Sequence, residues 1–596
     1  MSLKMKRLFA LLLCLSMIGA LIVGCNGQPV GTSTGTTGSS TTTTGSTTGS
    51  GETTTTAAPA GDPVKLSMGA IGFSSSADDP LWPSMWMQKL QSDLNIELEF
   101  IGYDEEKANL ALASGDLPDL MMINAKYVQQ VLDADYAVAM DDYLEEFGPN
   151  IKSFNMRNDI TRKFMSNGTN KLYFHRPNSG IEGATGYTEL WNGYIVRWDL
   201  YKQIGAPKMA NDDDYIAALN AMKAIYPKTE NGSPVYGMGI HNDWGLWGWV
   251  IRSYSNLGYI NLAHWGYASN SNTNEIVNNY LDYDTPSPFW NDMKFYNKMY
   301  LEGLLDPDSY TMKAEEVEDK AGKGQYLGGY CTWFLGNLYT NKRAEDPNTL
   351  AGFMAVPAEG QNGWYGQNSL TGWDGKDLFI TTKCEDITTA VKFIDYLDSP
   401  DANRSHYSGI QGVHWDYNSE GNPEIFKSTL DLKANGGDEW TKTGIASFAN
   451  FIGSAEFGVH PDGSYFTLFD DTAIKVQTLS PLQQDFSKFY NVEYPSQLHL
   501  NMVKAGKAVN QGNLIAAIQM GVSNIPSDVN RIDTKCDEII IKSIPSLVQA
   551  KTEAEFTANR DQVIADLKSA GAEEAWNWWK TNWDESKVFF DELVKK

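Results

Sequence analysis

The chain has 596 residues, a formal net charge of −27, five cysteines and 18 tryptophans. A chain of this length exceeds one ordinary domain and predicts about two to four domains or lobes. Its negative charge argues against nucleic-acid binding, which needs concentrated Lys and Arg. Five cysteines are too few for a disulfide scaffold in so long a chain. The tryptophans raise the question of whether their rings form cores or line a site.

The N-terminus has the features of a secretion signal. Basic residues precede an apolar run from Leu8 to Val23, which is too short and too weakly flanked for a permanent membrane span. The run ends in the sequence LIVGC at 21–25, which resembles the bacterial lipobox. This resemblance implies that residues 1–24 form a lipoprotein signal peptide. It also implies cleavage after Gly24 and attachment of lipid to Cys25.

Residues 25–62 are expected to form a lipid-anchored tether. Thr, Gly and Ser make up most of this segment, and no apolar periodicity runs through it. Such a sequence cannot bury enough apolar surface to offset the loss of chain entropy. We therefore expect the protein at the cell membrane, on the extracellular face of a Gram-positive-like cell, held by the lipid on Cys25.

The body begins with alternating strands and helices. Alternation of apolar and polar residues predicts strands at 64–68 and 96–101, and a short apolar run predicts a buried strand at 120–123. Helical spacing predicts helices at 80–90 and 105–113 between them. A strand–helix–strand order indicates parallel strands covered by helices.

The later sequence continues this pattern and then becomes helical. A strand is predicted at 194–197 and another at 377–381, and amphipathic helices are predicted at 212–226 and 388–397. Beyond residue 450 most segments have helical periodicity, including two helices within 553–583. The fold class predicted from these elements is α/β with a helical C-terminal region.

Several stretches resemble one family, the bacterial extracellular solute-binding protein family 1. These proteins are the lipoprotein components of carbohydrate-type ABC transporters. The resemblance covers most of 64–596 and lies in these segments: LASGDLPD at 112–119, WNGYIVRWDLYKQIG at 191–205, the segment 321–333, DLFITTKCEDITTAVKFIDYLDSP at 377–400, and the segment 409–421. The sequence departs from many relatives at Arg197-Trp198 and in its Trp-rich middle.

The resemblance implies a two-lobed periplasmic-binding-protein-like fold of type II with three inter-lobe crossings. We expect these crossings near Thr188, Thr371 and Gly437. A ligand would lie in the crevice between the lobes, at strand C-terminal ends, and hinge motion would trap it. The expected lobes are 63–188 with 372–437 for lobe 1, and 189–371 with 438–596 for lobe 2.

No pattern of catalytic or metal-binding residues stands out. The chain lacks H-E-x-x-H, a P-loop and G-x-G-x-x-G, and its seven histidines are isolated. The cysteines that follow the lipobox form no C-x-x-C pair and are expected to be buried thiols. Asp306-Pro-Asp308 and Pro461-Asp-Gly463 do not meet the calcium-loop pattern. The sequence therefore predicts a protein without enzymatic activity, cofactor or metal site.

Tryptophans in predicted loops, together with nearby polar residues, indicate a sugar-binding cleft. Glycines interrupt any helical period around Trp244, Trp247 and Trp249, which predicts a loop there. Pyranose rings stack their C–H patches on aromatic faces, and their hydroxyls need planar donors and acceptors. By contrast, the tryptophans from Trp576 to Trp583 have helical spacing and are expected to pack in a core. The predicted ligand-binding residues are Trp82, Asp104, Asn124, Trp191, Asp243, Trp244, Trp333, Trp364, Trp373 and Asp374.

The sequence thus predicts a monomeric binding protein that delivers an oligosaccharide to ABC permease subunits. One alternative is a peptide or small charged solute as the ligand, and a cluster of Arg176, Arg197 and Arg252 in the cleft would favour an anion. A second alternative is a surface glycoside hydrolase, which would need two carboxylates roughly 5–10 Å apart. A third is a sensor lipoprotein that hands its ligand to a membrane receptor.

Overall fold

In the computed structural model, Ala58–Lys596 form one compact unit, separate from Met1–Ala57. The predicted signal peptide, Cys25 and nearly all of the tether lie outside the described residues. No helix within the described ranges is long and apolar enough to cross a membrane. The structure describes residues 61–71, 83–177, 179, 193–243, 245–261, 264–270, 273, 275–283, 287–329, 335–340, 346, 348–365, 376–448, 451–454, 458–510 and 525–594.

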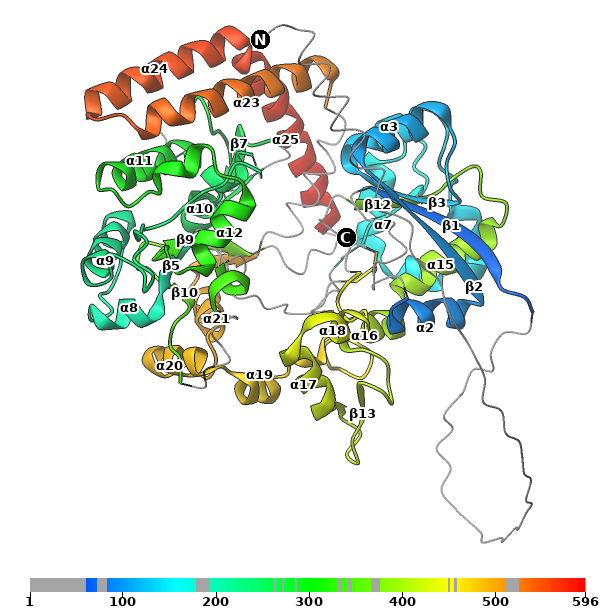
Figure 1. Ribbon diagram of the computed structural model, residues 1–596. Coiled ribbons are helices and arrows are strands. Elements are labelled where there is room, and N and C mark those ends of the chain that lie inside the picture. The colour runs from blue at the N-terminus through cyan, green and yellow to red at the C-terminus, as the bar shows by residue number, and fades with distance from the viewer. Residues whose placement is uncertain are drawn as a thin grey trace, which may run out of the picture. The chain divides into compact units, whose positions relative to one another are not determined.

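The first lobe is built on a five-stranded sheet in the order β2-β1-β3-β12-β4 (Figure 1). Strand β1 pairs in parallel with β2 and β3, and β12 runs antiparallel between β3 and β4. The strands predicted at 64–68, 96–101, 120–123 and 377–381 all belong to this sheet. Its strands are β1 (Val64–Ile71), β2 (Ile96–Tyr103), β3 (Leu120–Asn124), β4 (Phe174–His175) and β12 (Lys376–Ile380).

Both faces of this sheet are buried, which explains the apolar run in β3. Met122 packs in a core with helices α2, α5 and α15, whereas its neighbours Met121 and Ile123 pack on the opposite face against α3, α4 and α7. Because side chains alternate along a strand, β1, β3 and β12 each supply residues to both cores. The helices are α2 (Met85–Leu94), α3 (Glu105–Ser114), α4 (Val128–Asp133), α5 (Asp141–Phe147), α6 (Pro149–Ser153), α7 (Asn155–Phe164), α15 (Ile387–Asp398) and α16 (Pro400–Ser408).

Helix α2 begins at Met85 rather than at the predicted Pro80. The hydroxyl of Ser84 accepts a hydrogen bond from the Met87 amide and caps the helix. Asn95 ends the helix in the left-handed conformation, with φ 51°. A Ser cap and a left-handed Asn are common helix boundaries, so local chemistry sets both ends of α2.

The second lobe contains a three-stranded antiparallel sheet in the order β10-β5-β9. A Cβ on Gly328 would lie 2.2 Å from the Tyr215 hydroxyl oxygen and 2.7 Å from the Ile195 carbonyl oxygen. Only glycine therefore allows β9 to approach β5 this closely. The strands of this lobe are β5 (Tyr194–Arg197), β9 (Gly328–Gly329) and β10 (Phe353–Val356), with a separate sheet of β6 (Tyr259–Asn261), β7 (Tyr267–Asn270) and β8 (Ile276–Asn278).

One large core joins this sheet to its helices and to the C-terminal helices. Trp579 and Trp583 are fully buried in it, and Trp576 and Trp578 pack against it, which confirms the prediction that these rings pack. Asp533 accepts hydrogen bonds from Trp579 Nε1 at 2.8 Å and from the Tyr267 hydroxyl at 2.9 Å. The helices are α8 (Trp198–Gln203), α9 (Asp212–Ile225), α10 (Trp247–Leu257), α11 (Pro288–Leu301), α12 (Ala314–Gly322), α23 (Ser527–Val548), α24 (Glu553–Ala570) and α25 (Ala572–Val594).

The chain leaves the first lobe after β4 and returns to it at β12, and then remains there longer than predicted. Phe448 stacks on Trp86 with ring centroids 5.1 Å apart, and Phe466 lies in the same core. Gly436 caps helix α18 (Gly437–Thr441), and Gly437 is the first residue of that helix. Because Leu482 belongs to the core of the second lobe, we propose that the third crossing lies between Phe469 and Leu482.

The remaining elements lie around these two lobes. Strand β11 pairs in parallel with β15, although the two are more than a hundred residues apart in sequence. Strands β13 and β14 form a hairpin. These elements are β11 (Gly363–Tyr365), β13 (Trp415–Tyr417), β14 (Pro423–Ile425), β15 (Ala508–Asn510), α17 (Lys427–Asn435), α18 (Gly437–Thr441), α19 (Thr472–Thr478), α20 (Pro481–Tyr490) and α21 (Gln497–Lys504), with short helices at Ala125–Tyr127, Pro307–Tyr310, Gly336–Thr340 and Leu468–Asp470.

Candidate functional site

One edge of the first sheet brings together the ends of all five strands. The parallel strands β1, β2 and β3 end there at Ile71, Tyr103 and Asn124, and the antiparallel strand β12 begins there at Lys376. Strand β4 also ends at this edge, at His175. In open α/β sheets, ligands bind outside the carboxyl ends of the strands. This carboxyl edge is therefore the first candidate site.

A lysine and an amide meet at the carboxyl edge. Lys376 Nζ lies 2.9 Å from Asn124 Oδ1 and 3.4 Å from the Ile71 carbonyl oxygen, and both side chains are half-buried. The structure thus places the predicted residue Asn124 at the sheet edge. Sequence reasoning missed Lys376, whose only local signal is its position one residue before the predicted strand.

Buried ion pairs lie directly behind this edge. Arg157 donates to both carboxylate oxygens of Asp398, at 2.9 and 2.6 Å, and His175 Nε2 lies 2.9 Å from Asp398 Oδ1. Burial raises the pKa of Asp398, but Arg157 and His175 outweigh it and hold this pKa at about 2. Burial lowers the pKa of His175 despite the neighbouring carboxylate. The neutral imidazole of His175 therefore donates from Nε2 to Asp398, and the charge of Asp398 is compensated by that of Arg157.

The three arginines that would favour an anionic ligand each face a carboxylate. All three are almost fully buried. Their charges are thus already compensated inside the protein, which reduces their capacity to attract a free anion. The pairs and their shortest N–O distances are Arg176–Asp377 at 3.8 Å, Arg197–Asp199 at 2.6 Å and Arg252–Asp212 at 2.7 Å.

Two predicted acidic residues have structural roles at helix starts. Asp104 follows β2 and accepts a hydrogen bond from the Lys107 amide at 2.8 Å, which caps α3. Asp243 accepts one from the Ala314 amide at 2.7 Å, at the first residue of α12. Both side chains are exposed. Capping accounts for their positions, and their contact with ligand stays a prediction.

The predicted aromatic residues of the site are not described. Trp364 belongs to β11, but its side chain lies outside the described part of the structure. Among other loop candidates, Trp247 and Trp249 instead belong to α10, and Trp249 is buried between Tyr296 and Tyr310. The predicted site residues that lie outside the described ranges are Trp82, Trp191, Trp244, Trp333, Trp373 and Asp374.

The second lobe presents a comparable edge with neutral amides. Strand β5 begins at this edge, and β9 and β10 end there. Gln361 Nε2 donates to Asn256 Oδ1 at 3.3 Å, and the Asn362 amide donates to the Asn256 carbonyl at 3.0 Å. Asn256 is 3% exposed, and its Nδ2 has no hydrogen-bond partner among the described residues. A buried, unpaired amide donor is costly unless something else satisfies it.

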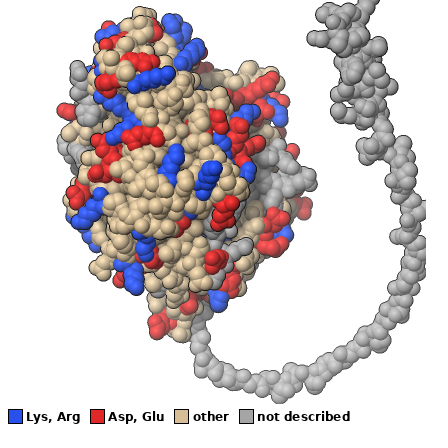
Figure 2. All heavy atoms as spheres, turned by 60° about the vertical axis from the view of Figure 1, so that its left-hand side comes forward, with Lys and Arg blue, Asp and Glu red and all other residues tan. Residues whose placement is uncertain are grey.

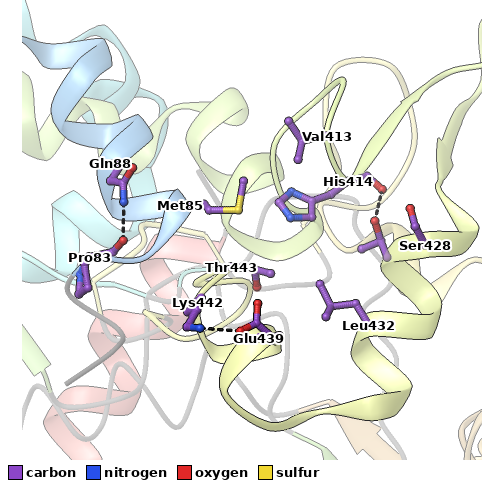
Figure 3. A pocket seen from close by; sticks show the side chains of 11 residues that line it. Pro83, Met85, Gln88, Val413, His414, Ser428, Leu432, Glu439, Lys442 and Thr443 are labelled. Atoms are coloured by element: carbon purple, nitrogen blue, oxygen red, sulfur yellow. Dashed lines mark hydrogen bonds and ion pairs between the residues drawn. The ribbon is translucent and has the colours of Figure 1, made fainter. Parts of the chain in front are cut away.

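A groove of about 640 Å³ lies beside the start of α2 (Figure 3). Its volume falls within the range of roughly 300–1,000 Å³ that is typical of small-molecule sites. Nothing in the sequence predicted it, because its walls come from segments more than three hundred residues apart. It is lined by Pro83, Met85, Gln88, Val413, His414, Ser428, Thr429, Leu432, Glu439, Lys442 and Thr443.

The described residues contain no cluster of three or more His, Cys, Asp or Glu that could hold a metal ion. Cys384 and Cys536 are free and buried. Burial raises the pKa of Cys384 to about 11 and that of Cys536 to about 12. Both thiols are therefore protonated near neutral pH and are poor nucleophiles.

No family model matches the chain. It is 22% identical over 283 residues to lipoprotein LipO of Bacillus subtilis (strain 168), which covers 46% of this chain and 51% of LipO. It is also 22% identical over 382 residues to the fructooligosaccharide ABC transporter substrate-binding protein FusA of Streptococcus pneumoniae serotype 4, covering 60% of this chain and 65% of FusA. The matches thus span about half to two thirds of these relatives.

Solved structures extend the likeness to nearly the whole body. The structure of S. pneumoniae FusA in complex with kestose aligns with a TM-score of 0.58 at 15% identity, covering 88% of this chain and 99% of that one. Because the sequence identity is low, this structural agreement shows that the two proteins share a fold, and no more than that. The chain thus has the two-lobed fold of ABC-transporter substrate-binding proteins, and its resemblance to the extracellular solute-binding proteins is confirmed.

Proposed function

We propose that this protein is an extracellular, lipid-anchored solute-binding protein that captures an oligosaccharide and delivers it to an ABC permease. The observation that carries the proposal is the carboxyl edge of the first sheet, where five strand ends meet in a fold shared with FusA. FusA is named for fructooligosaccharide binding and has been solved with kestose. A sugar of this kind is the first ligand class to test.

The described polar groups suit a neutral ligand rich in hydroxyls. At the carboxyl edge, Lys376 supplies N–H donors and Asn124 an amide. At the edge of the second lobe, Asn256 supplies an N–H that has no partner within the described ranges. Sugar hydroxyls both donate and accept, so planar amides on either side can fix their orientation. Closure of the lobes by a hinge would bring the two edges onto one ligand.

The proposal includes the predicted ligand contacts that the structure does not test. Stacking of sugar rings on loop tryptophans supplies most of the buried area at low entropy cost. The carboxylates accept sugar hydroxyls through charge-assisted hydrogen bonds. The proposed residues, in addition to Asn124, are Trp82, Asp104, Trp191, Asp243, Trp244, Trp333, Trp364, Trp373 and Asp374.

Binding without catalysis fits the carboxylates behind the carboxyl edge. A glycoside hydrolase needs one carboxylic acid and one carboxylate that both reach the substrate. Asp398 is fully buried and paired with Arg157 and His175, and Asp377 is fully buried beside Arg176. Neither can approach a glycosidic bond. We therefore propose a binding protein without catalytic activity. We also propose that it acts as a monomer and needs no cofactor.

The location proposed for the protein follows from its N-terminus. Signal cleavage after Gly24 would leave Cys25 as the lipidated first residue. The Thr-rich tether would then hold the acidic body away from anionic lipid headgroups. On the face shown in Figure 2, Lys and Arg side chains are interspersed with Asp and Glu and form no continuous basic surface. Mass spectrometry of the N-terminal peptide, with Cys25→Ser as the control, tests the anchor.

Isothermal titration calorimetry against a panel of ligands tests the function. The panel contains neutral oligosaccharides, acidic oligosaccharides and short peptides. We expect micromolar or tighter binding of a neutral oligosaccharide and no hydrolysis of it during the titration. Binding of peptides alone would refute the sugar assignment, and release of shorter sugars would refute the assignment as a binding protein.

A further inference from the structure

Hydrogen bonds fix both sides of the groove beside α2. The Met85 amide donates to the Lys442 carbonyl at 2.9 Å, and the Trp86 amide donates to the Thr443 carbonyl at 3.1 Å. These bonds join the start of α2 to the end of α18. The Thr429 hydroxyl donates to the His414 carbonyl at 2.8 Å and fixes α17 on the other side. Hydrogen bonds to backbone carbonyls therefore fix the shape of the groove, which does not depend on mobile side chains.

The groove lies at the N-terminal end of α2, and the chain topology gives the direction of that end. Strands β1 and β2 are parallel, and α2 lies between them in the chain. The helix of such a unit runs antiparallel to its strands, so it starts near the carboxyl end of the first strand. The start of α2 is therefore the end of the helix that is directed toward the carboxyl edge, and we infer that a ligand held at that edge extends toward the groove.

His414 is a buried donor that faces this groove. Its Nδ1 accepts a hydrogen bond from the Ile410 amide at 2.9 Å, so the proton of the neutral ring lies on Nε2. Burial lowers the pKa of His414, which keeps the ring neutral at pH 7. The residue is 4% exposed, its ring points toward Met85 in Figure 3, and Nε2 has no partner among the described residues.

The other polar groups that line the groove can accept or donate hydrogen bonds, and they surround an apolar wall. Gln88 donates from Nε2 to the Pro83 carbonyl at 2.6 Å, which leaves Oε1 as an acceptor. The exposed hydroxyl of Ser428 can donate or accept. The charges of Glu439 and Lys442 compensate each other at 2.5 Å. The apolar wall consists of Met85, Val413 and Leu432.

We propose that this groove is a subsite for one end of a neutral oligosaccharide whose main part lies at the carboxyl edge. This inference rests on the proposed function and extends it to ligand length. His414 Nε2 donates to a sugar oxygen, Gln88 Oε1 accepts from a hydroxyl, and the C–H face of the sugar lies on Met85 and Leu432. Because the charges in the groove are paired, uncharged sugars are preferred over uronic acids.

The test compares two tryptophan substitutions on α17. Ser428→Trp fills the groove, whereas Ala434→Trp places the same ring at an exposed position of the same helix that does not line it. Calorimetry of the full-length protein uses fructo-oligosaccharides and malto-oligosaccharides from the disaccharide to the hexasaccharide. We expect native protein and Ala434→Trp to bind the longest members about tenfold more tightly than Ser428→Trp does, and all three to bind the shortest members equally.

A second variant tests the donor itself. In His414→Asn, the side-chain oxygen can still accept from the Ile410 amide, but the Nε2 donor is lost. We expect about a threefold to tenfold loss of affinity for the longer sugars, as for one neutral hydrogen bond, with an unchanged melting temperature. Equal affinities of native, Ser428→Trp and His414→Asn proteins for every sugar would overturn the subsite and leave the proposed function standing. Failure of the native protein to bind any oligosaccharide would overturn both.

Discussion

The buried pair of Arg157 and Asp398 provides the sharpest test of how the first lobe is held together. Both side chains are at most 1% exposed, and two hydrogen bonds of 2.9 and 2.6 Å join them. In Asp398→Ala the guanidinium of Arg157 stays buried without its carboxylate. Removal of one partner from such a pair costs about 3–5 kcal/mol. We therefore expect a loss of this size in the unfolding free energy of the lobe at pH 7.

The effect should depend on pH in a defined direction. The pKa of Asp398 is about 2 in the folded protein, against 3.8 as its ordinary value. A lowered carboxyl pKa contributes stability above pH 3.8, and this stability is lost as the pH falls through about 2. The difference corresponds to about 2 kcal/mol. The native lobe should therefore lose this amount between pH 4 and pH 2, whereas Asp398→Ala should not.

Hydrogen exchange of the β12 amides in a urea series measures this free energy within the lobe. The matched control is Asp401→Ala, three residues further along the chain, where the carboxylate side chain is 95% exposed. We expect a change of at most about 0.5 kcal/mol for the control. Equal losses in both variants, or an unchanged pH profile in Asp398→Ala, would refute the reasoning.

Three further predictions concern the two sheet edges. Lys376→Met should lower oligosaccharide affinity about tenfold in calorimetry, because donors beside Asn124 are lost. Asn256→Ala should lower that affinity similarly, because the Nδ2 donor, which has no partner among the described residues, is lost. A thermal scan should also show a lower melting temperature, since Gln361 Nε2 loses its buried acceptor. Gly328→Ala should cost about 1–3 kcal/mol in urea unfolding, because its Cβ would overlap the Tyr215 hydroxyl.

Periodicity predicted the strands and helices well wherever one local rule dominated. The alternation of apolar and polar residues predicted β1 and β2, and the apolar run at 120–123 predicted β3. The helix predicted at 212–226 is α9, whose start is capped by Asn211 as an ordinary N-cap. Such signals survive because each element satisfies its own hydrogen bonds and buries one continuous set of apolar side chains.

Helix α10 shows where glycine misled the interpretation. Gly245 and Gly248 interrupt the pattern around Trp247 and Trp249 and suggested a loop. In the structure, a Cβ on Gly248 would lie 3.2 Å from Ile240 Cγ2, so this glycine permits close packing of a helix. A single sequence gives no means of separating a glycine that breaks a helix from one that lets it pack.

The groove and the third crossing depend on contacts between distant segments. The stacking of Phe448 on Trp86 holds residues beyond 437 in the first lobe, and neither residue alone indicates the other. His414 was one of seven isolated histidines, for which packing is the usual role. Its Nδ1 bond and its unpaired Nε2 become visible only after the chain has folded.

The distribution of charge links the site to the class of ligand. Behind the carboxyl edge the strongly charged groups are buried in mutual pairs, as in Arg157 with Asp398. The amides of Asn124 and Asn256 lie at the two edges. An anionic ligand would gain little from guanidinium groups that already bind carboxylates, whereas a hydroxyl-rich ligand can satisfy amides without breaking any ion pair. Apart from Lys376, whose ammonium can also donate to a hydroxyl, the arrangement favours an uncharged sugar, and an acidic oligosaccharide that binds more tightly than its neutral counterpart would contradict it.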